Sequence, residues 1–228
     1  GVDLRDVERG GSWTWHGPGQ LVAYPVIALR RWNLKVPAFV AGLEWAMALL
    51  VQRLLSRCGV EVEAVGLRVG VLGGFPGTWV ERSDGTRAKV GAVGVHVRRF
   101  VSLHGLALNL RPEPWGFQWI IPCGLDAVET TSVARLVEEF GGDAAALSLP
   151  VEVGAELAEL LPDDLPLHGL GIGKPENVLA AWRLGYHTFD CTLPTRDARQ
   201  GRLYQSTSET FTGDYVYLHV EKERFSRD

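Results

Sequence analysis

The sequence predicts an α+β fold in which a mixed, antiparallel-rich sheet is backed by a few helices. Between Val60 and Leu110 the apolar residues follow a period of two and β-branched side chains dominate, which is typical of strands. Between Pro37 and Arg57 the apolar residues recur at helical spacing instead. After residue 162 a short strand, a helix and a second strand follow one another, which indicates a C-terminal βα fragment of a different kind.

Length and composition support a folded chain with one sizeable core. At roughly 150 residues per domain, the 228 residues correspond to about one and a half domains. Apolar residues make up 46% and charged residues 22%, which excludes a disordered or collagen-like chain. The formal net charge of −4 excludes a global basic field that would draw the protein onto phosphate backbones.

The first elements are justified by glycine, proline and the hydrophobic pattern. Residues 10–19 are too rich in glycine for a regular element and too aromatic for a linker, so we expect a shaped loop. A strand is predicted over Leu21–Leu29 and a long helix over Pro37–Arg57, because Pro37 suits a first helical turn and Gly59 a stop. Asp84-Gly85 lies between two strand-like runs and predicts a β-hairpin.

The remaining elements follow the same reasoning. The sheet is expected to continue to Leu110, a strand to end at Trp119–Pro122, and helices to form over Thr131–Phe140 and near Val151–Leu161. A strand over Leu167–Ile172, a helix from Lys174 to Gly185 and a strand over Tyr186–Asp190 complete the chain. We place a domain boundary near residue 162, which separates a domain of residues 1–162 from a segment of residues 163–228.

Several function classes are excluded at this stage. Glu44, Gln52 and Arg53 interrupt the longest apolar stretch, so we expect no membrane span. The chain opens on neither Met nor a basic and apolar leader, which predicts no secretory signal and a missing N-terminal portion. Three widely spaced cysteines indicate a reducing, cytoplasmic compartment, and the scattered histidines show no spacing for a metal site.

Cys123 and Lys89 are the candidate reactive pair. Cys123 lies beside Gly124 at a predicted strand end, where a substrate carbonyl could approach and backbone N–H groups could face an oxyanion. Lys89 precedes the small, apolar run 90–94, so its amine is expected to be partly desolvated. It would act either as a cation that stabilises the Cys123 thiolate or as a neutral amine that takes the thiol proton. The competing interpretations are a buried structural cysteine and a solvated lysine at a strand end.

Four sequence blocks occur in a characteristic order: Arg9–Leu21 with Tyr24-Pro25, Lys89–Gly94, Ser102–Asn109 and Ile121–Leu125. In order and spacing they resemble the lipoyl(octanoyl)transferase family over roughly residues 1–160. The resemblance implies a fold shared with biotin and lipoate protein ligases. It also implies transfer of an octanoyl group from acyl carrier protein to a lysine of lipoyl domains, in 2-oxoacid dehydrogenases or the glycine cleavage H protein.

By this resemblance Cys123 would form a thioester acyl-enzyme and Lys89 would be its acid/base partner. No cofactor is expected, because acyl exchange between thioesters is nearly balanced and needs no ATP. His16 and His104 each lie beside a glycine and are open to a structural or a catalytic role. The residues that would line the acyl pocket are Arg9, Gly10, Gly11, Ser12, Trp13, Thr14, Trp15, His16, Ala92, Val93, Gly94, Gly105, Leu106 and Ala107.

The segment after residue 162 carries a second resemblance. Gly169–Glu176 and Thr188–Arg199 are similar to the tRNA-guanine transglycosylase family, which implies part of a TIM barrel with Asp190 as carboxylate nucleophile. Thr195, Arg196 and Arg199 would then contact tRNA near the anticodon. Residues 163–228 are too few for an eight-stranded barrel of about 250 residues. Taken alone, Asp190 could be a turn cap and the arginines a solvated face.

Three functions therefore compete: octanoyl transfer through Cys123 and Lys89, base exchange in tRNA through Asp190, and an inactive module that binds acyl chains in the Arg9–His16 pocket. The distance between the Lys89 amine and the Cys123 sulfur separates the first from the others, because a reacting pair must lie within about 3–4 Å.

Overall fold

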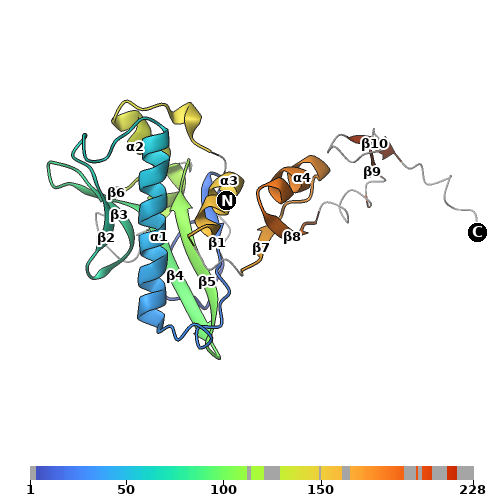
Figure 1. The fold of residues 1–228 in the computed structure, drawn as a ribbon, viewed down its shortest axis with the longest axis horizontal. Coiled ribbons are helices and arrows are strands. Elements are labelled where there is room, and N and C mark those ends of the chain that lie inside the picture. The colour runs from blue at the N-terminus through green and yellow to red at the C-terminus, as the bar shows by residue number, and fades with distance from the viewer. Residues whose placement is uncertain are drawn as a thin grey trace, which may run out of the picture. The chain divides into compact units, whose positions relative to one another are not determined.

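The structure, a computed structural model, describes residues 4–111, 114–120, 129–148, 150–160, 165–192, 199, 202–206 and 215–219. The chain folds as two compact units, Gly1–Leu157 and Ala158–Asp228, and each is described by itself. Figure 1 shows the sheet and the long helix of the first unit.

The first unit is built on one sheet whose strand order is β1-β5-β4-β3-β2, with each neighbouring pair antiparallel. The short β6 pairs in parallel with β4 at Ala88 and Lys89, beside the stretch of β4 that pairs with β5. This arrangement confirms the predicted α+β fold with a mixed, antiparallel-rich sheet. The strands are β1 (Gln20–Ala23), β2 (Arg68–Leu72), β3 (Phe75–Glu81), β4 (Arg87–Arg98), β5 (Val101–Asn109) and β6 (Glu129–Thr130).

The helix α1 (Val36–Arg57) lies along one face of this sheet (Figure 1). Pro37 occupies its first turn, and Gly59 follows it with a φ of +85° that a side chain would disfavour. By length and composition alone α1 would also pass for a membrane span, with a mean hydropathy of 1.5. Leu43, Met47 and Leu50 are nonetheless at most 2% exposed, and α1 packs on the sheet as a core helix does.

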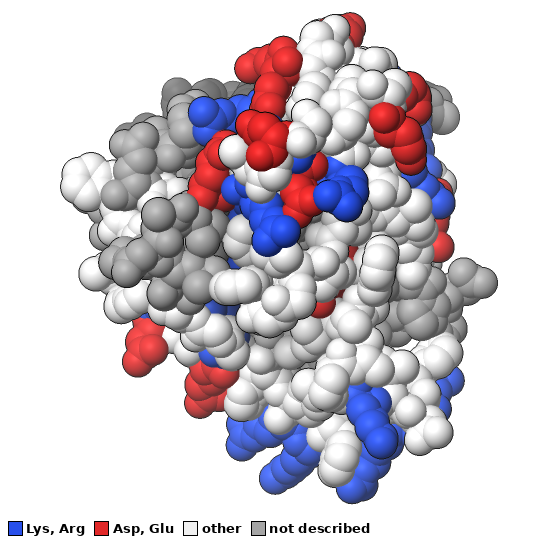
Figure 2. Space-filling view, turned by 90° about the vertical axis from the view of Figure 1, so that its left-hand side faces the viewer, with Lys and Arg blue, Asp and Glu red and all other residues white. Residues whose placement is uncertain are grey.

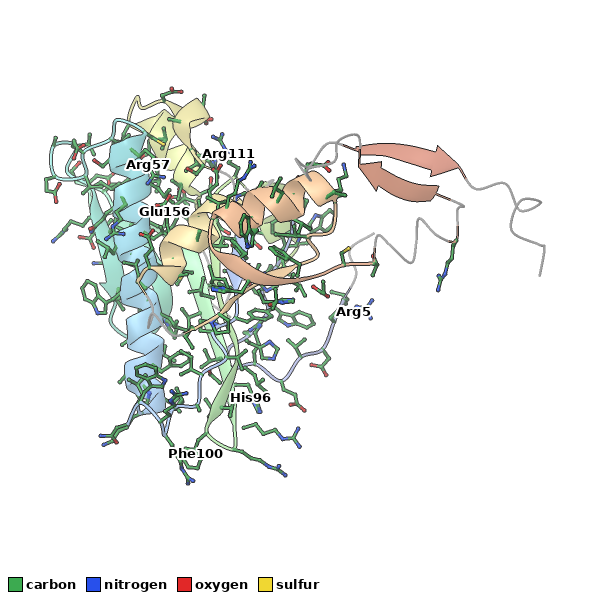
Figure 3. All side chains as sticks on the ribbon, turned by 45° about the vertical axis from the view of Figure 1, so that its right-hand side comes forward. Arg5, Arg57, His96, Phe100, Arg111 and Glu156 are labelled. Atoms are coloured by element: carbon green, nitrogen blue, oxygen red, sulfur yellow. The ribbon has the colours of Figure 1, made fainter. Side chains whose placement is uncertain are left out.

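Ion pairs join the helices of this unit to the sheet and to one another. Arg82, at the end of the β3 strand, holds Glu139 of α2 (Val133–Glu139) with Nε–Oε1 at 2.5 Å. At the end of α1, Arg57 pairs with Glu156 of α3 (Pro150–Ala158) at 2.5 Å. Figure 3 labels both residues. The predicted hairpin at Asp84-Gly85 is confirmed, since Gly85 has a φ of +82° and Glu81 pairs with Arg87 across it.

Three predicted strands differ from the structure. Residues 61–66 form hydrogen-bonded turns, so the sheet resumes at Arg68 rather than Val60. The strand β1 ends at Ala23 instead of Leu29, because Pro25 has no N–H to continue the ladder. Trp119, predicted in a strand, ends the 3₁₀ helix η1 (Pro114–Trp119), since Pro114 suits a first turn. Trp119 is 73% exposed.

In the second unit, β7 (Leu167–Leu170), α4 (Pro175–Arg183) and β8 (Tyr186–Asp190) follow in order, and the two strands pair in parallel. This is the βα fragment that the sequence predicts. Two further strands, β9 (Arg202–Ser206) and β10 (Tyr215–His219), form an antiparallel pair. In the first unit, a short 3₁₀ helix, η3 (Ala144–Ala146), lies between α2 and α3.

Candidate active site

The floor of the candidate pocket is a strip of small residues on the sheet. Ala92 of β4 lies opposite Ala107 of β5, and Gly94 lies opposite Gly105. A Cβ on Gly91 would meet Met47 of α1 at 3.0 Å, so by strand alternation Ala92 and Gly94 face away from α1. Because these side chains are methyl groups or hydrogens, other segments approach the sheet closely here: Arg9 and Gly10 lie against Gly94, and Ala23 and Pro25 lie against Gly105.

The loop of residues 9–16 covers this strip. The Gly10 N–H donates to the Val95 carbonyl at 3.0 Å, and a Cβ on Gly94 would meet Arg9 Cδ at 3.0 Å. Trp15 is buried, and its ring meets Phe117 edge-on with centroids 5.5 Å apart. The loop is therefore held over the sheet at both ends.

A small pocket lies between the loop and the sheet. The structure thus brings the three separate sequence segments of the predicted acyl pocket together. Gly10 and Trp15 do not line it but anchor the loop, whereas Tyr24 and His104, which the prediction left out of the pocket, do line it. Its lining residues are Arg9, Gly11, Ser12, Trp13, Thr14, His16, Tyr24, Ala92, Val93, Gly94, His104, Gly105, Leu106 and Ala107.

Lys89 lines a second, smaller cavity that shares Thr14, Ala92 and Ala107 with the first pocket. A β-bulge interrupts the β3–β4 ladder here, since Trp79 pairs with Lys89 and Thr78 with Gly91. Such a bulge re-aims neighbouring side chains. Lys89 is only 6% exposed, and its Nζ donates to the Pro76 carbonyl at 2.7 Å. The predicted desolvation of this lysine is therefore what the structure shows, and the alternative of a solvated lysine is wrong.

Sequence reasoning missed Gly77, which lies against the lysine, and Glu44, which holds Gly77. Gly77 has a φ of +116°, and a Cβ there would lie 2.6 Å from Lys89 Cε and 3.1 Å from Lys89 Nζ. Its N–H donates to the buried carboxylate of Glu44, with N–Oε1 at 2.6 Å. Glu44 could have been noticed as the one acidic residue within the apolar face of the predicted helix.

A chain of side-chain hydrogen bonds forms another wall of the lysine cavity. Gln20 Nε2 donates to Asn109 Oδ1 at 2.8 Å, and Asn109 Nδ2 donates to the Thr131 carbonyl at 3.0 Å. His16 Nδ1 lies 3.2 Å from Gln20 Oε1. Desolvation lowers the pKa of His16 and outweighs the opposing effect of this hydrogen bond, while the Arg9 charge lowers it further. His16 is thus held neutral at pH 7, where it can donate or accept a hydrogen bond.

Cys123, Thr195 and Arg196 lie outside the described residues, so the predicted pairing of Cys123 with Lys89 stays a prediction. In the second unit, Asp190 Oδ1 is 3.2 Å from His168 Nε2 and accepts from the Gly171 N–H at 3.2 Å. Arg199 is exposed. Among the described residues, no group of three or more His, Cys, Asp or Glu is placed to hold a metal ion.

Comparison with known proteins identifies the family of this chain. The family model described as the lipoyl protein ligase A/B catalytic domain matches residues 1–146, and the chain belongs to that family. A second family model, described as queuine tRNA-ribosyltransferase, matches residues 140–228. The two resemblances seen in the sequence are therefore both present, one in each part of the chain.

The chain is similar to several proteins named octanoyltransferase. That of Desulfotalea psychrophila is 40% identical over 163 residues, which cover 72% of this chain and 64% of the relative. That of Cutibacterium acnes is 37% identical over 164 residues, covering 72% and 56%. That of Acidiphilium cryptum is 44% identical over 133 residues, covering 56% and 54%. The chain thus spans less than two thirds of the length of these relatives.

Proposed function

We propose that this chain is an octanoyltransferase of lipoate biosynthesis that acts in the cytoplasm. The donor is octanoyl-acyl carrier protein, and the acceptor is a lysine of a lipoyl domain, in 2-oxoacid dehydrogenases or the glycine cleavage H protein. One observation carries this proposal: the buried Lys89 amine lies in a cavity that shares walls with a pocket assembled from the family blocks.

The pocket suits a linear acyl chain. Its floor at Ala92 and Ala107 carries only methyl groups, against which unbranched methylene groups can pack. Apolar burial of such a chain contributes about 0.8 kcal/mol for each methylene group. The shared wall at Ala92 and Ala107 leads from this floor toward Lys89, which orients the reacting end of the chain toward the amine.

In the first half-reaction, the Cys123 thiol gives its proton to the Lys89 amine, and the sulfur attacks the thioester carbonyl of the donor. A bond forms between the Cys123 sulfur and the acyl carbon, while the bond from that carbon to the carrier sulfur breaks. Lys89 then returns the proton to the departing carrier thiolate. The products are an octanoyl thioester on Cys123 and a free carrier thiol.

In the second half-reaction, the amine of the acceptor lysine attacks the acyl carbon on Cys123. The amide bond forms as the carbon–sulfur bond breaks, and Lys89 passes the amine proton to the Cys123 sulfur. The hydrogen bond from Lys89 Nζ to the Pro76 carbonyl supports this role, because it holds the amine in one place through both halves.

Intact-protein mass spectrometry after incubation with octanoyl-acyl carrier protein tests the proposal. We expect one added octanoyl group that hydroxylamine removes, and none on Cys123→Ala. Lys89→Met is expected to acquire the group far more slowly, while the buried-cysteine control Cys58→Ala keeps the label. A Cys123→Ala protein that still becomes acylated would refute the proposal.

Base exchange in tRNA is a second candidate, favoured by the match of residues 140–228 and by the two hydrogen bonds that orient Asp190. Incorporation of labelled guanine into tRNA tests it. We expect none, because the second unit's described residues hold a single parallel strand pair, whereas the barrel reaction uses eight strands.

The remaining candidate is an inactive acyl-binding module. It would retain octanoate in the pocket without turnover, and alkylation of Cys123 would leave that binding unchanged. We favour the transferase over this candidate because a module that only binds acyl chains has no need of a buried lysine beside the pocket.

A further inference from the structure

A basic and aromatic surface lies at the end of the β4–β5 hairpin, and we call it the tip surface. Figure 2 shows Lys and Arg side chains gathered at the lower end of the molecule, below a mostly uncharged face. Residues 28–36 and 95–103, which build this end, include no Asp or Glu, although the whole chain has 27 acidic and 23 basic residues. The tip surface consists of the exposed residues Arg30, Arg31, Trp32, Lys35, Arg98, Arg99 and Phe100.

Main-chain and side-chain contacts hold the two segments of the tip surface together. The Leu29 N–H donates to the Phe100 carbonyl at 2.8 Å, and Ala28 forms a β-bridge with Val101. The guanidinium carbon of Arg30 lies 3.5 Å from the centre of the Phe100 ring, a cation–π contact. The charges therefore sit on a fixed framework rather than on a loose loop.

The two turn residues at the tip adopt backbone conformations that their side chains disfavour. Arg99 and Phe100 have φ values of 50° and 65°, in the left-handed region where Asn and Gly are favoured. A turn serving stability alone would place Asn-Gly at these positions. Strained side chains of this kind are found where their display serves a function. The choice of Arg and Phe therefore points to a role for the side chains themselves.

The tip surface stands at a defined distance from the pocket. Gly94, on the pocket floor, precedes Arg98 by four residues of the same strand, which is about 13 Å at roughly 3.3 Å per residue. Figure 3 shows Phe100 at the end of the hairpin, with His96 between it and the body of the sheet. A partner bound at the tip could reach the pocket only with an acyl group held on an extended arm.

We propose that the tip surface is the docking site of the carrier protein that donates the acyl group, and that it recognises an acidic face of that protein. This inference rests on the proposed octanoyl transfer. A protein fits better than a nucleic acid, because Arg30 covers one face of Phe100 and blocks base stacking there. Glu8, whose carboxylate lies 3.9 Å from His96 Nε2, marks the acidic border of the surface.

The test compares two octanoyl donors with the full chain. Octanoyl-acyl carrier protein can use the tip surface, whereas a small octanoyl thioester of N-acetylcysteamine can use only the pocket. For Arg98→Glu/Arg99→Glu we expect kcat/KM to fall about tenfold or more with the carrier protein and to stay within about threefold with the small thioester. Raising the salt concentration should weaken the wild-type reaction with the carrier protein selectively.

The matched control is Arg53→Glu/Arg135→Glu, which makes the same change in charge at exposed positions of α1 and α2. Arg53 lies 17 residues beyond the start of α1, about 26 Å along the helix axis. This control is expected to keep wild-type activity with both donors. An equal loss with both donors in the tip variant, no loss, or an equal loss in the control would overturn the docking site.

Three further outcomes separate the kind of partner, the proposed function and the docking site. Tip-dependent binding of a short RNA or of anionic vesicles that is tighter than binding of the carrier protein would overturn a protein partner. If the wild-type chain transfers from neither donor, the proposed function fails and the docking proposal falls with it. Transfer from both donors without tip dependence refutes the docking site alone.

Discussion

Replacing Gly77 by alanine should disable the site without removing any reactive group. The new Cβ would lie 2.6 Å from Lys89 Cε and closer still to the Gly91 carbonyl, distances that real Cβ atoms do not show. Alanine would also have to adopt the φ of +116°, at a cost of about 1–3 kcal/mol. Either β3 or the Lys89 side chain must move, and either movement displaces the Lys89 amine from its present position.

We expect the rate of octanoyl transfer by Gly77→Ala to fall by about 100-fold, the usual effect of a misplacement of about 1 Å. The melting temperature should fall by roughly 2–12 °C, because about 2–4 °C accompany each kcal/mol in a chain of this size. Activity is therefore measured well below the new melting temperature, alongside near-UV circular dichroism. Gly73→Ala is the control, since a Cβ there meets nothing within 4 Å.

A double-mutant cycle separates a local effect from general damage. If Gly77→Ala acts through the lysine, Gly77→Ala/Lys89→Met should be no slower than Lys89→Met alone. Additive losses, or wild-type activity in Gly77→Ala, would refute the reasoning that the missing side chain at residue 77 positions Lys89.

The other predictions concern stability. Glu44→Leu leaves the Gly77 N–H without its acceptor and should cost about 1–3 kcal/mol in urea unfolding, whereas Glu44→Gln keeps an acceptor oxygen and should cost less. Arg82→Met removes the ion pairs to Glu139 and Glu129, so it should cost about 1 kcal/mol at low salt. A loss that persists undiminished in 1 M salt would contradict an electrostatic origin. Burial raises the pKa of the Cys58 thiol, so the folded chain keeps a proton that the unfolded chain releases. Its stabilising effect is present below the ordinary thiol pKa and lost as the pH rises toward the raised one. As the pH rises through the ordinary thiol pKa of about 8.5, the wild type should therefore lose more unfolding free energy than Cys58→Ala, and equal losses would contradict this.

Local sequence patterns were sufficient to predict most of the helices and strands. Helical spacing between a proline and a glycine predicted α1 to within one residue, and Asp84-Gly85 predicted its hairpin, because both signals act within a few residues. The errors fell where local and tertiary preferences compete. Val60, Val62 and Leu67 lie in the predicted strand region and are buried, but hydrogen-bonded turns rather than a strand bury them.

The order of the four blocks, the apolar periodicity and the βα pattern after residue 162 are properties of the chain alone, and they were enough for the fold class and the family. The environment of Lys89 was decided by the tertiary structure. A bulge opposite Trp79, the missing side chain of Gly77 and the carboxylate of Glu44 meet there from three elements. Residues 44, 77 and 89 are separated along the chain: the pairing of β3 with β4 brings Gly77 against Lys89, and the packing of α1 on the sheet brings Glu44 within hydrogen-bond distance of Gly77.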